Sequence, residues 1–151
     1  MSDIRVVVAE DEAIIRMDLV EVLREEGYDV VADTGRGDDA VALVTEHRPD
    51  LALLDVKMPG MTGIEAALEI TSSTDTAVVM LTAFSQRELI HEASDAGAMA
   101  YLLKPYQRED LVPAVELAIA RRREAASLRS ELDAAGQRFE ERKTIDRAKG
   151  K

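Results

Sequence analysis

An unbroken apolar run at residues 51–54 (LALL) constrains the fold of this chain more than any other stretch. Asp55 follows the run at once, and Pro59 and Gly60 come a few residues later. Such a segment, bounded by loop-forming residues, is typical of the centre of a parallel sheet covered on both faces. Asp55 would then emerge at the carboxyl end of the strand, where open α/β sheets bind ligands. Taken alone, the stretch slightly favours another interpretation, in which Asp55 only caps the following turn.

Four further apolar runs of strand length alternate with segments of helical periodicity. The runs cover residues 4–9, 28–32, 77–81 and 100–103, and the helical patterns between them cover residues 13–26, 38–48, 63–70 and 85–96. Strands that alternate with helices predict repeated βαβ units, whose right-handed crossovers produce a mainly parallel sheet. The predicted fold class is therefore a doubly wound α/β domain with helices on both faces. The order of its strands cannot be read from this pattern.

Capping residues indicate where the helices should begin and end. Asp38 or Asp39 can cap the second helix, and Ser85 can cap the fourth. Gly27 is expected to end the first helix as Gly97 ends the fourth, since glycine adopts the left-handed conformation at low cost. Pro113 is expected in the first turn of the last helix, where its missing N–H group does no harm.

Composition limits the classes of protein that this chain can represent. With 151 residues, 46% hydrophobic and 32% charged, the chain is long enough for one soluble globular domain and a modest appendage. It has no cysteine, which suits a reducing cytoplasm, and no apolar run approaches membrane-spanning length. The net charge of −11 divides into −15 for residues 1–120 and +4 for residues 121–151. The acidic body should repel nucleic acid, and the basic tail is read first as a solvated helix face.

Polar residues follow four of the predicted strands. Glu10 and Asp11 come after the first, Asp55 after the third, Thr82 after the fourth and Lys104 after the fifth. Because the carboxyl ends of parallel strands share one edge, these side chains should converge although they are far apart in sequence. Clustered carboxylates call for a cation, and an all-oxygen site favours Mg²⁺. Asp55 would then be the nucleophile that takes up a phosphoryl group as an acyl phosphate, with Lys104 on a phosphoryl oxygen.

Each residue of this cluster also has a structural explanation. Acids after a strand often cap the next helix, Thr82 is a β-branched residue suited to a strand, and Lys104 can simply be solvated. The agreement of four strand ends is what favours a functional site.

At this point the sequence resembles the receiver domain of two-component response regulators, through AEDE (9–12), LLDVKMPGMTG (53–63), LTA (81–83) and YLLKP (101–105). The match runs over about residues 4–121, so a receiver domain is expected over residues 1–121. It implies a flavodoxin-like strand order 2-1-3-4-5, for which a member of this family is a standard example.

The resemblance implies a role for individual residues. Asp55 matches the phosphoacceptor, which a sensor histidine kinase would phosphorylate. Glu10, Asp11, Asp55 and the Lys57 carbonyl match the surroundings of Mg²⁺. The family catalyses only its own phosphorylation and dephosphorylation, so no further enzyme activity is expected. A flavin enzyme is disfavoured because acids follow the first strand, and a paired-aspartate phosphatase because Lys57 stands two residues after Asp55. An interaction module that is never phosphorylated stays open.

Four further positions match the signalling part of the family pattern. Thr82 and Lys104 match the two phosphoryl-sensing residues, and Tyr101 matches the switch aromatic that packs inward when the threonine moves. For Tyr101 the structural alternative is a half-buried strand tyrosine. The Lys104–Pro105 bond matches the family's usual cis peptide, an isomer that only proline makes inexpensive.

The last helix is expected to continue past the receiver into residues 122–151. No proline or glycine interrupts it until Gly136, and Ala125, Leu128, Leu132, Ala135 and Phe139 follow coiled-coil spacing. This pattern modestly favours a linker helix that pairs between two protomers over an amphipathic helix that folds back on its own domain.

The final residues, FEERKTIDRAKGK, resemble the opening of the ANTAR module, an RNA-binding transcription antitermination domain that follows receivers. The match covers only about a dozen residues, and the helical bundle that should follow it is absent from the sequence. Either the chain is a fragment or it ends early. RNA binding is expected only if that output module is present.

Overall fold

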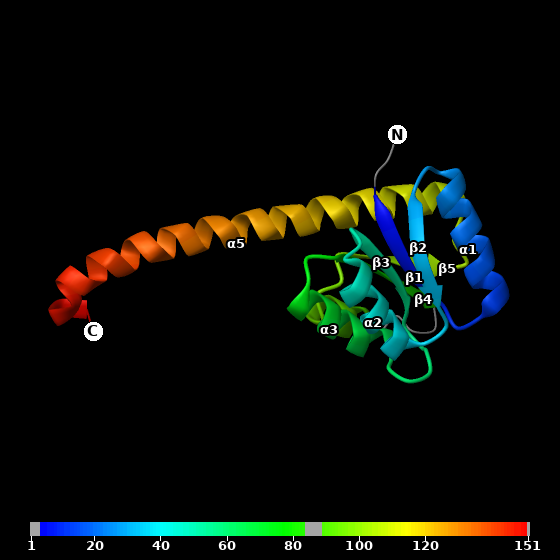
Figure 1. Cartoon of the computed structure of the whole chain (residues 1–151), viewed down its shortest axis with the longest axis horizontal. Helices are drawn as coiled ribbons and strands as arrows, with labels where there is room; N and C mark the ends of the chain where they lie inside the picture. Colours follow the sequence, from blue (N-terminus) through cyan, green and yellow to red (C-terminus); the bar gives the residue numbers. More distant parts are fainter. Residues whose placement is uncertain (1–3, 84–88, 151) are drawn as a thin grey trace.

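Five parallel strands form the sheet in the computed structural model, which describes residues 4–83 and 89–150. The strands are β1 (Arg5–Ala9), β2 (Asp29–Thr34), β3 (Leu51–Asp55), β4 (Ala77–Ala83) and β5 (Ala100–Lys104). Their order is β2-β1-β3-β4-β5, and all neighbouring strands pair in parallel (Figure 1). The predicted doubly wound α/β class and the order 2-1-3-4-5 are therefore confirmed.

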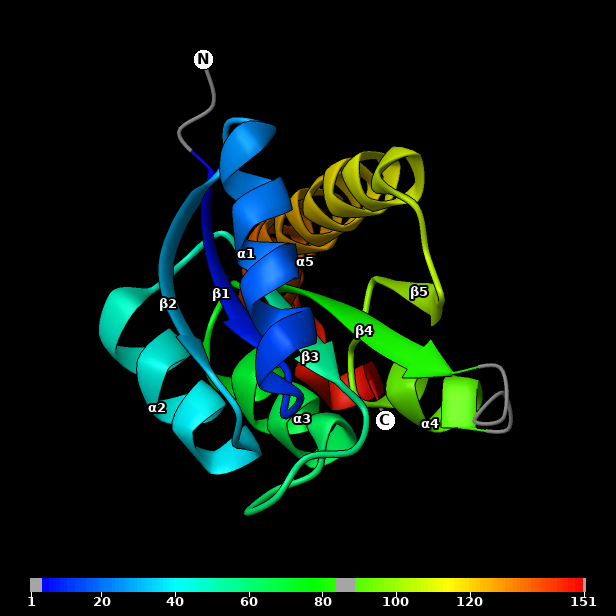
Figure 2. The same cartoon turned by 90° about the vertical axis from the view of Figure 1, so that its right-hand side faces the viewer.

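Helices cover both faces of this sheet (Figure 2). They are α1 (Ala13–Glu25), α2 (Gly37–His47), α3 (Gly63–Ser73), α4 (Ile90–Asp95) and α5 (Arg108–Gly150). One core contains residues of α1 and α5, and the second contains residues of α2, α3 and α4. Alternate residues of β1 supply the two cores, with Val6 and Val8 in the first and Val7 and Ala9 in the second. All five residues of β3 are buried, as expected for a central strand.

The predicted cap of α2 is wrong. The helix begins at Gly37 with Arg36 as its N-cap, and Asp38 instead forms an ion pair with Arg36. The cause is a tertiary contact, because a Cβ atom at position 37 would overlap the carbonyl oxygen of Met61. Glycine at this position lets the start of α2 pack against the loop after β3.

Other expected helix ends have mixed outcomes. Gly27 and Gly97 follow the ends of α1 and α4 with φ values of +96° and +100°, as predicted. Pro113 lies inside α5, five residues after its first residue Arg108, so its placement in the first turn is wrong. The helix starts earlier than expected, where the Asp110 side chain accepts a hydrogen bond from the Gln107 N–H group. Ser85, the predicted cap of the fourth helix, lies outside the described residues.

Helix α5 extends far beyond the sheet as a continuous helix (Figure 1). Its first part packs on the domain through Leu111, Val115, Ala118 and Ile119. Further along, Leu128 and Leu132 are 54% and 70% exposed. The helix therefore projects away from the domain and does not fold back on it. Within the described parts of the chain, no helix is both long and apolar enough to cross a membrane.

Candidate functional site

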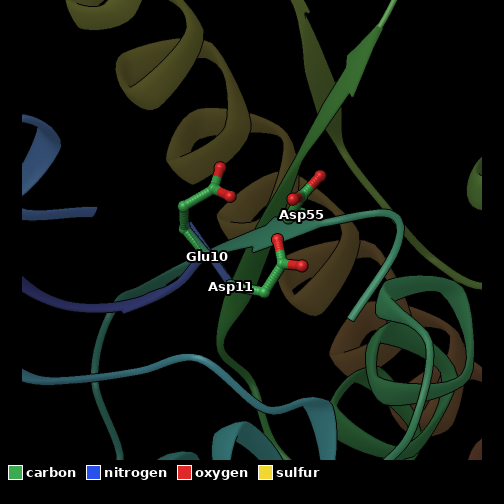
Figure 3. Close-up of side chains that lie close together, drawn as sticks. All are labelled: Glu10, Asp11 and Asp55. Atoms are coloured by element: carbon green, nitrogen blue, oxygen red, sulfur yellow. The ribbon is translucent and has the colours of Figure 1, made fainter. Parts of the chain in front are cut away.

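Three carboxylates meet at the carboxyl edge of the sheet (Figure 3). Glu10 and Asp11 directly follow β1, and Asp55 is the last residue of β3. Because β1 and β3 are neighbours, their ends place these side chains together. Each residue offers one carboxylate oxygen, and these oxygens lie within 4.8 Å of one another. The convergence predicted for these three residues is confirmed.

Glu10 is the fully buried member of the cluster. Its carboxylate accepts hydrogen bonds from the Lys104 ammonium at 2.9 Å and from the Glu12 N–H group at 3.1 Å. The Arg16 side chain donates to the Glu10 backbone carbonyl at 2.7 Å and forms an ion pair with Asp33. The loop after β1 is thereby fixed by contacts from α1 and β5.

Lys104 connects two of the carboxylates. It is the last residue of β5, and its Nζ atom lies 2.9 Å from Glu10 Oε1 and 3.3 Å from Asp55 Oδ2. The peptide bond to Pro105 is cis, as the family resemblance implied. The structure thus brings Lys104 to the predicted cluster with its positive charge between two acids.

The charges of the cluster shift its proton affinities in opposite directions. Burial and the nearby Glu10 carboxylate raise the pKa of Asp55 to about 7. Burial opposes ionisation of Glu10 as well, but hydrogen bonds from Lys104 and from the Glu12 N–H group outweigh it and lower the pKa of Glu10. Burial disfavours the charged form of Lys104, yet its hydrogen bond to Glu10 and the charge of Asp55 raise its pKa. Asp55 is therefore harder to ionise than Glu10.

The donor set fits a hard divalent cation. All three candidate ligands are carboxylates; Glu10 and Asp55 are buried, and Asp11 is exposed at the mouth of the cluster. Mg²⁺ prefers oxygen ligands and retains several waters, which suits one exposed side of the site. A cation here would also offset the repulsion between Glu10 and Asp55.

The loop after β3 is shaped by the start of α3. The Thr62 hydroxyl caps this helix by accepting from the Glu65 N–H group, and the Glu65 carboxylate accepts from the Thr62 N–H group, so the two form a capping box. A Cβ atom at Gly63 would overlap the Asp55 carbonyl oxygen, so only glycine lets the helix approach this closely. Lys57 is exposed within the loop. The role of its carbonyl as a metal ligand stays a prediction.

Thr82 and Tyr101 occupy strands next to the cluster. Thr82 is buried near the end of β4, one residue beyond Leu81, which pairs with Asp55. Its hydroxyl oxygen lies 3.3 Å from the Ala83 carbonyl oxygen. Tyr101 is 49% exposed on β5, three residues before Lys104. Their signalling roles stay predictions, and the structure places Tyr101 at the surface.

Two residues near the site were missed by the sequence analysis. Tyr106 follows the cis proline, and burial together with the charge of Glu10 raises the pKa of its phenol to about 12. Arg16 supports the loop after β1 from the first helix. Tyr106 could have been found from its position just after a strand end. The spacing of Arg16 from Glu10 carried no comparable signal.

Comparisons with known proteins agree with this geometry. The family model of the response regulator receiver domain matches residues 6–116. Transcriptional regulatory protein PdtaR of Mycobacterium tuberculosis is 56% identical over 146 residues, which cover 97% of this chain and 71% of PdtaR.

Solved structures extend the comparison to the whole fold. The signal receiver domain of NarL from Mycobacterium tuberculosis has a TM-score of 0.75 and 34% identity, covering 80% of this chain and 98% of that one. A chain in which a yeast Spc42 trimeric coiled coil is fused to another structure has a TM-score of 0.75 and 25% identity. The match covers 96% of this chain and 97% of the Spc42 fusion, so it includes most of the projecting helix.

Proposed function

Since this chain belongs to the response regulator receiver domain family, we propose that it is a cytoplasmic signalling switch that is phosphorylated on Asp55 by a sensor histidine kinase. The observation that carries the proposal is the position of the Asp55 carboxylate, at a strand end beside the Glu10 carboxylate and the Lys104 ammonium that bridges the two acids. An Asp55 oxygen forms a bond to phosphorus while the bond from phosphorus to the kinase imidazole nitrogen breaks. The imidazole keeps the electron pair, and an acyl phosphate results.

Other residues of the cluster support this transfer. Glu10, Asp11, Asp55 and the Lys57 carbonyl would hold Mg²⁺, whose charge favours the ionised carboxylate of Asp55 and offsets that of the phosphoryl group. Lys104, 3.3 Å from Asp55 Oδ2, would donate a hydrogen bond to a phosphoryl oxygen. Thr82, near the end of the neighbouring strand, would donate a hydrogen bond from its hydroxyl group to another phosphoryl oxygen. The protein would catalyse only its own phosphorylation and dephosphorylation.

Acetyl phosphate and Mg²⁺ provide a test that needs no kinase. Intact-protein mass spectrometry should show one phosphoryl group on the parent chain and none on Asp55→Asn. Asp38→Asn is a matched control, since Asp38 is exposed, is paired with Arg36 and is not one of the three clustered carboxylates. Full labelling of the Asp55→Asn protein would remove Asp55 from this role, and an unlabelled parent chain would favour an interaction module that works without phosphorylation.

We further propose that the output of the switch is transcription antitermination, exerted through dimers. Support comes from the resemblance of residues 139–151 to the start of an ANTAR module and from the similarity to a transcriptional regulatory protein. In this proposal Thr82 and Tyr101 transmit phosphorylation to α5. Residues 122–151 act as a linker helix that pairs with its copy in a second protomer. The seam contains the exposed Leu128 and Leu132. RNA would be bound by the ANTAR module, not by these 151 residues.

Measurement of self-association tests whether the linker helix pairs between two protomers. Leu132→Asp puts a charge into the seam and should abolish any dimer seen by sedimentation before or after phosphorylation. Ser127→Asp adds the same charge at an exposed position outside the seam and should leave the dimer intact. Labelling of Asp55 should be unchanged in both variants. A dimer that survives Leu132→Asp, or tight salt-sensitive binding of RNA hairpins by this chain, would contradict the assignment of the tail.

A further inference from the structure

A buried cation lies where α5 leaves the domain. Arg122 is 7% exposed, while its neighbours Arg121 and Arg123 lie at the surface. Its Nη2 atom donates to two backbone carbonyl oxygens, that of Thr71 at 3.1 Å and that of Thr74 at 2.5 Å. Burial of an arginine is unfavourable unless its donors find acceptors. The burial of Arg122 therefore points to a specific contact and not to a solvated helix face.

The two acceptors belong to the carboxyl end of α3. Thr71 lies in the last turn of this helix, and Thr74 is its C-cap residue. The last carbonyl groups of a helix have no partner within the helix and carry partial negative charge, so a cation is favourable there. The last turn of α3 contains no basic residue of its own. Arg122 supplies the missing cation from a helix about fifty residues later in the chain.

A second contact ties α5 to the turn before β5. The Arg121 side chain donates to the Met99 carbonyl at 2.8 Å. The same turn packs on the acceptor of Arg122, because the Thr71 hydroxyl lies 2.8 Å from the Ala96 carbonyl oxygen, and a Cβ atom at Gly97 would overlap that hydroxyl. One stretch of α5 is thus joined to the turn before β4 and to the turn before β5.

We propose that Arg122, assisted by Arg121, is the anchor that fixes the direction in which α5 projects from the domain. Ile119 is the last buried hydrophobic residue of α5 among those whose side chains are described, so the buried hydrophobic part of the helix ends before the anchor. The family match ends at residue 116, and the anchor lies beyond it. It is therefore not accounted for by the part of the chain that matches the receiver family.

A distance measurement tests the anchor directly. The chain has no cysteine, so Glu46→Cys on α2 and Ser127→Cys on α5 would carry two spin labels at exposed positions without other changes. Labelled protein is diluted with unlabelled protein, so that the pulsed electron paramagnetic resonance signal reports distances within one chain. The parent should give a single narrow distribution. Arg122→Met should give one about twofold wider, because methionine cannot donate to either carbonyl.

Two further variants make the result decisive. Arg123→Met removes the same charge from the next residue, which is exposed, and should keep the narrow distribution. Arg122→Lys keeps the charge but lacks the guanidinium fork, and it should widen the distribution even if the Met variant does not fold. Circular dichroism and labelling by acetyl phosphate confirm that each variant is native. A folded Arg122→Met or Arg122→Lys protein with the parent's distribution would overturn the proposal.

Discussion

The carboxyl of Asp55 is held in surroundings that oppose its ionisation. Burial and the Glu10 carboxylate raise its pKa to about 7, and the attraction of Lys104 only partly offsets them. The phosphoacceptor proposed here therefore gains most from a cation, because a bound cation stabilises the carboxylate that the fold destabilises. The same residue should weaken the fold when no metal is present.

The stability of the metal-free protein should depend on pH through Asp55. In the unfolded chain its proton leaves near the ordinary value of 3.8, whereas the folded chain keeps it until about pH 7. The folded state binds more protons in this window, so the contribution of Asp55 to the free energy of unfolding falls as pH rises through it. Asp55→Asn has no carboxyl group to ionise at this position, so it does not lose this stability as the pH rises. We expect it to be up to about 4 kcal/mol more stable than the parent at pH 8, since each pKa unit corresponds to about 1.4 kcal/mol, and to match the parent below about pH 4.

Urea unfolding at several pH values measures this difference. Asp38→Asn is a control of opposite sign, because a hydrogen bond from Arg36 lowers the pKa of Asp38. That carboxylate stabilises the fold above its ordinary pKa and loses the effect in acid. Asp38→Asn should therefore be the less stable protein at neutral pH. A constant gap between Asp55→Asn and the parent across the pH range would contradict the account of Asp55.

A substitution at Asp11 tests whether this residue is a metal ligand or only a helix cap. It is exposed beside two buried acids, so Asp11→Ala should leave the fold intact and relieve some repulsion in the metal-free protein. Loss of a ligand should weaken Mg²⁺ binding by at least about tenfold, because mutation of residues that only hydrogen-bond to metal ligands already lowers metal affinity by about that factor. Titration calorimetry measures the affinity. Unchanged affinity would show that Asp11 only ends the loop before α1.

At the scale of elements, the close approach of α3 to β3 sets the position of Asp55. A Cβ atom at Gly63 would overlap the Asp55 carbonyl oxygen. Gly63→Ala should therefore destabilise the protein by about 1–3 kcal/mol and slow labelling, although alanine is normally the better helix former. Gly136→Ala makes the same substitution inside the projecting part of α5 and should increase helicity. Thermal unfolding distinguishes them, and a stabilised Gly63→Ala protein would contradict the proposed contact.

The strands could be predicted because burial on both faces leaves a direct pattern in the sequence. The run at residues 51–54 predicted β3, and the acids after two runs predicted the cluster of Glu10, Asp11 and Asp55. The start of α2 could not be predicted, since it depends on the Met61 carbonyl packing against Gly37. The burial of Arg122 could likewise not be predicted, because nothing in a run of three arginines indicates which one is buried. Contacts between distant segments decide such details, and local pattern does not record them.

At the scale of the molecule, the proposed phosphorylation site and the proposed helix anchor lie at opposite ends of the sheet. Asp55 and Lys104 end their strands, whereas Arg121 and Arg122 contact the turns that precede β5 and β4. Strand β5 joins the two ends, from the turn at Met99 to Lys104. A signal from Asp55 to the projecting helix therefore has to pass along the sheet or through the helices that cover it.

The central claim is that the phosphoryl group resides on Asp55, and chemical mapping tests it most directly. Borohydride reduces an acyl phosphate to an alcohol, so a phosphorylated aspartate becomes homoserine at the labelled position. Trypsin does not cleave between Arg48 and Pro49, so one peptide, residues 37–57, carries Asp38, Asp39, Asp50 and Asp55. Fragmentation by tandem mass spectrometry must therefore assign the site. After acetyl phosphate and Mg²⁺ we predict homoserine at position 55 alone; homoserine at position 11 or 50, with unmodified Asp55, would contradict the account.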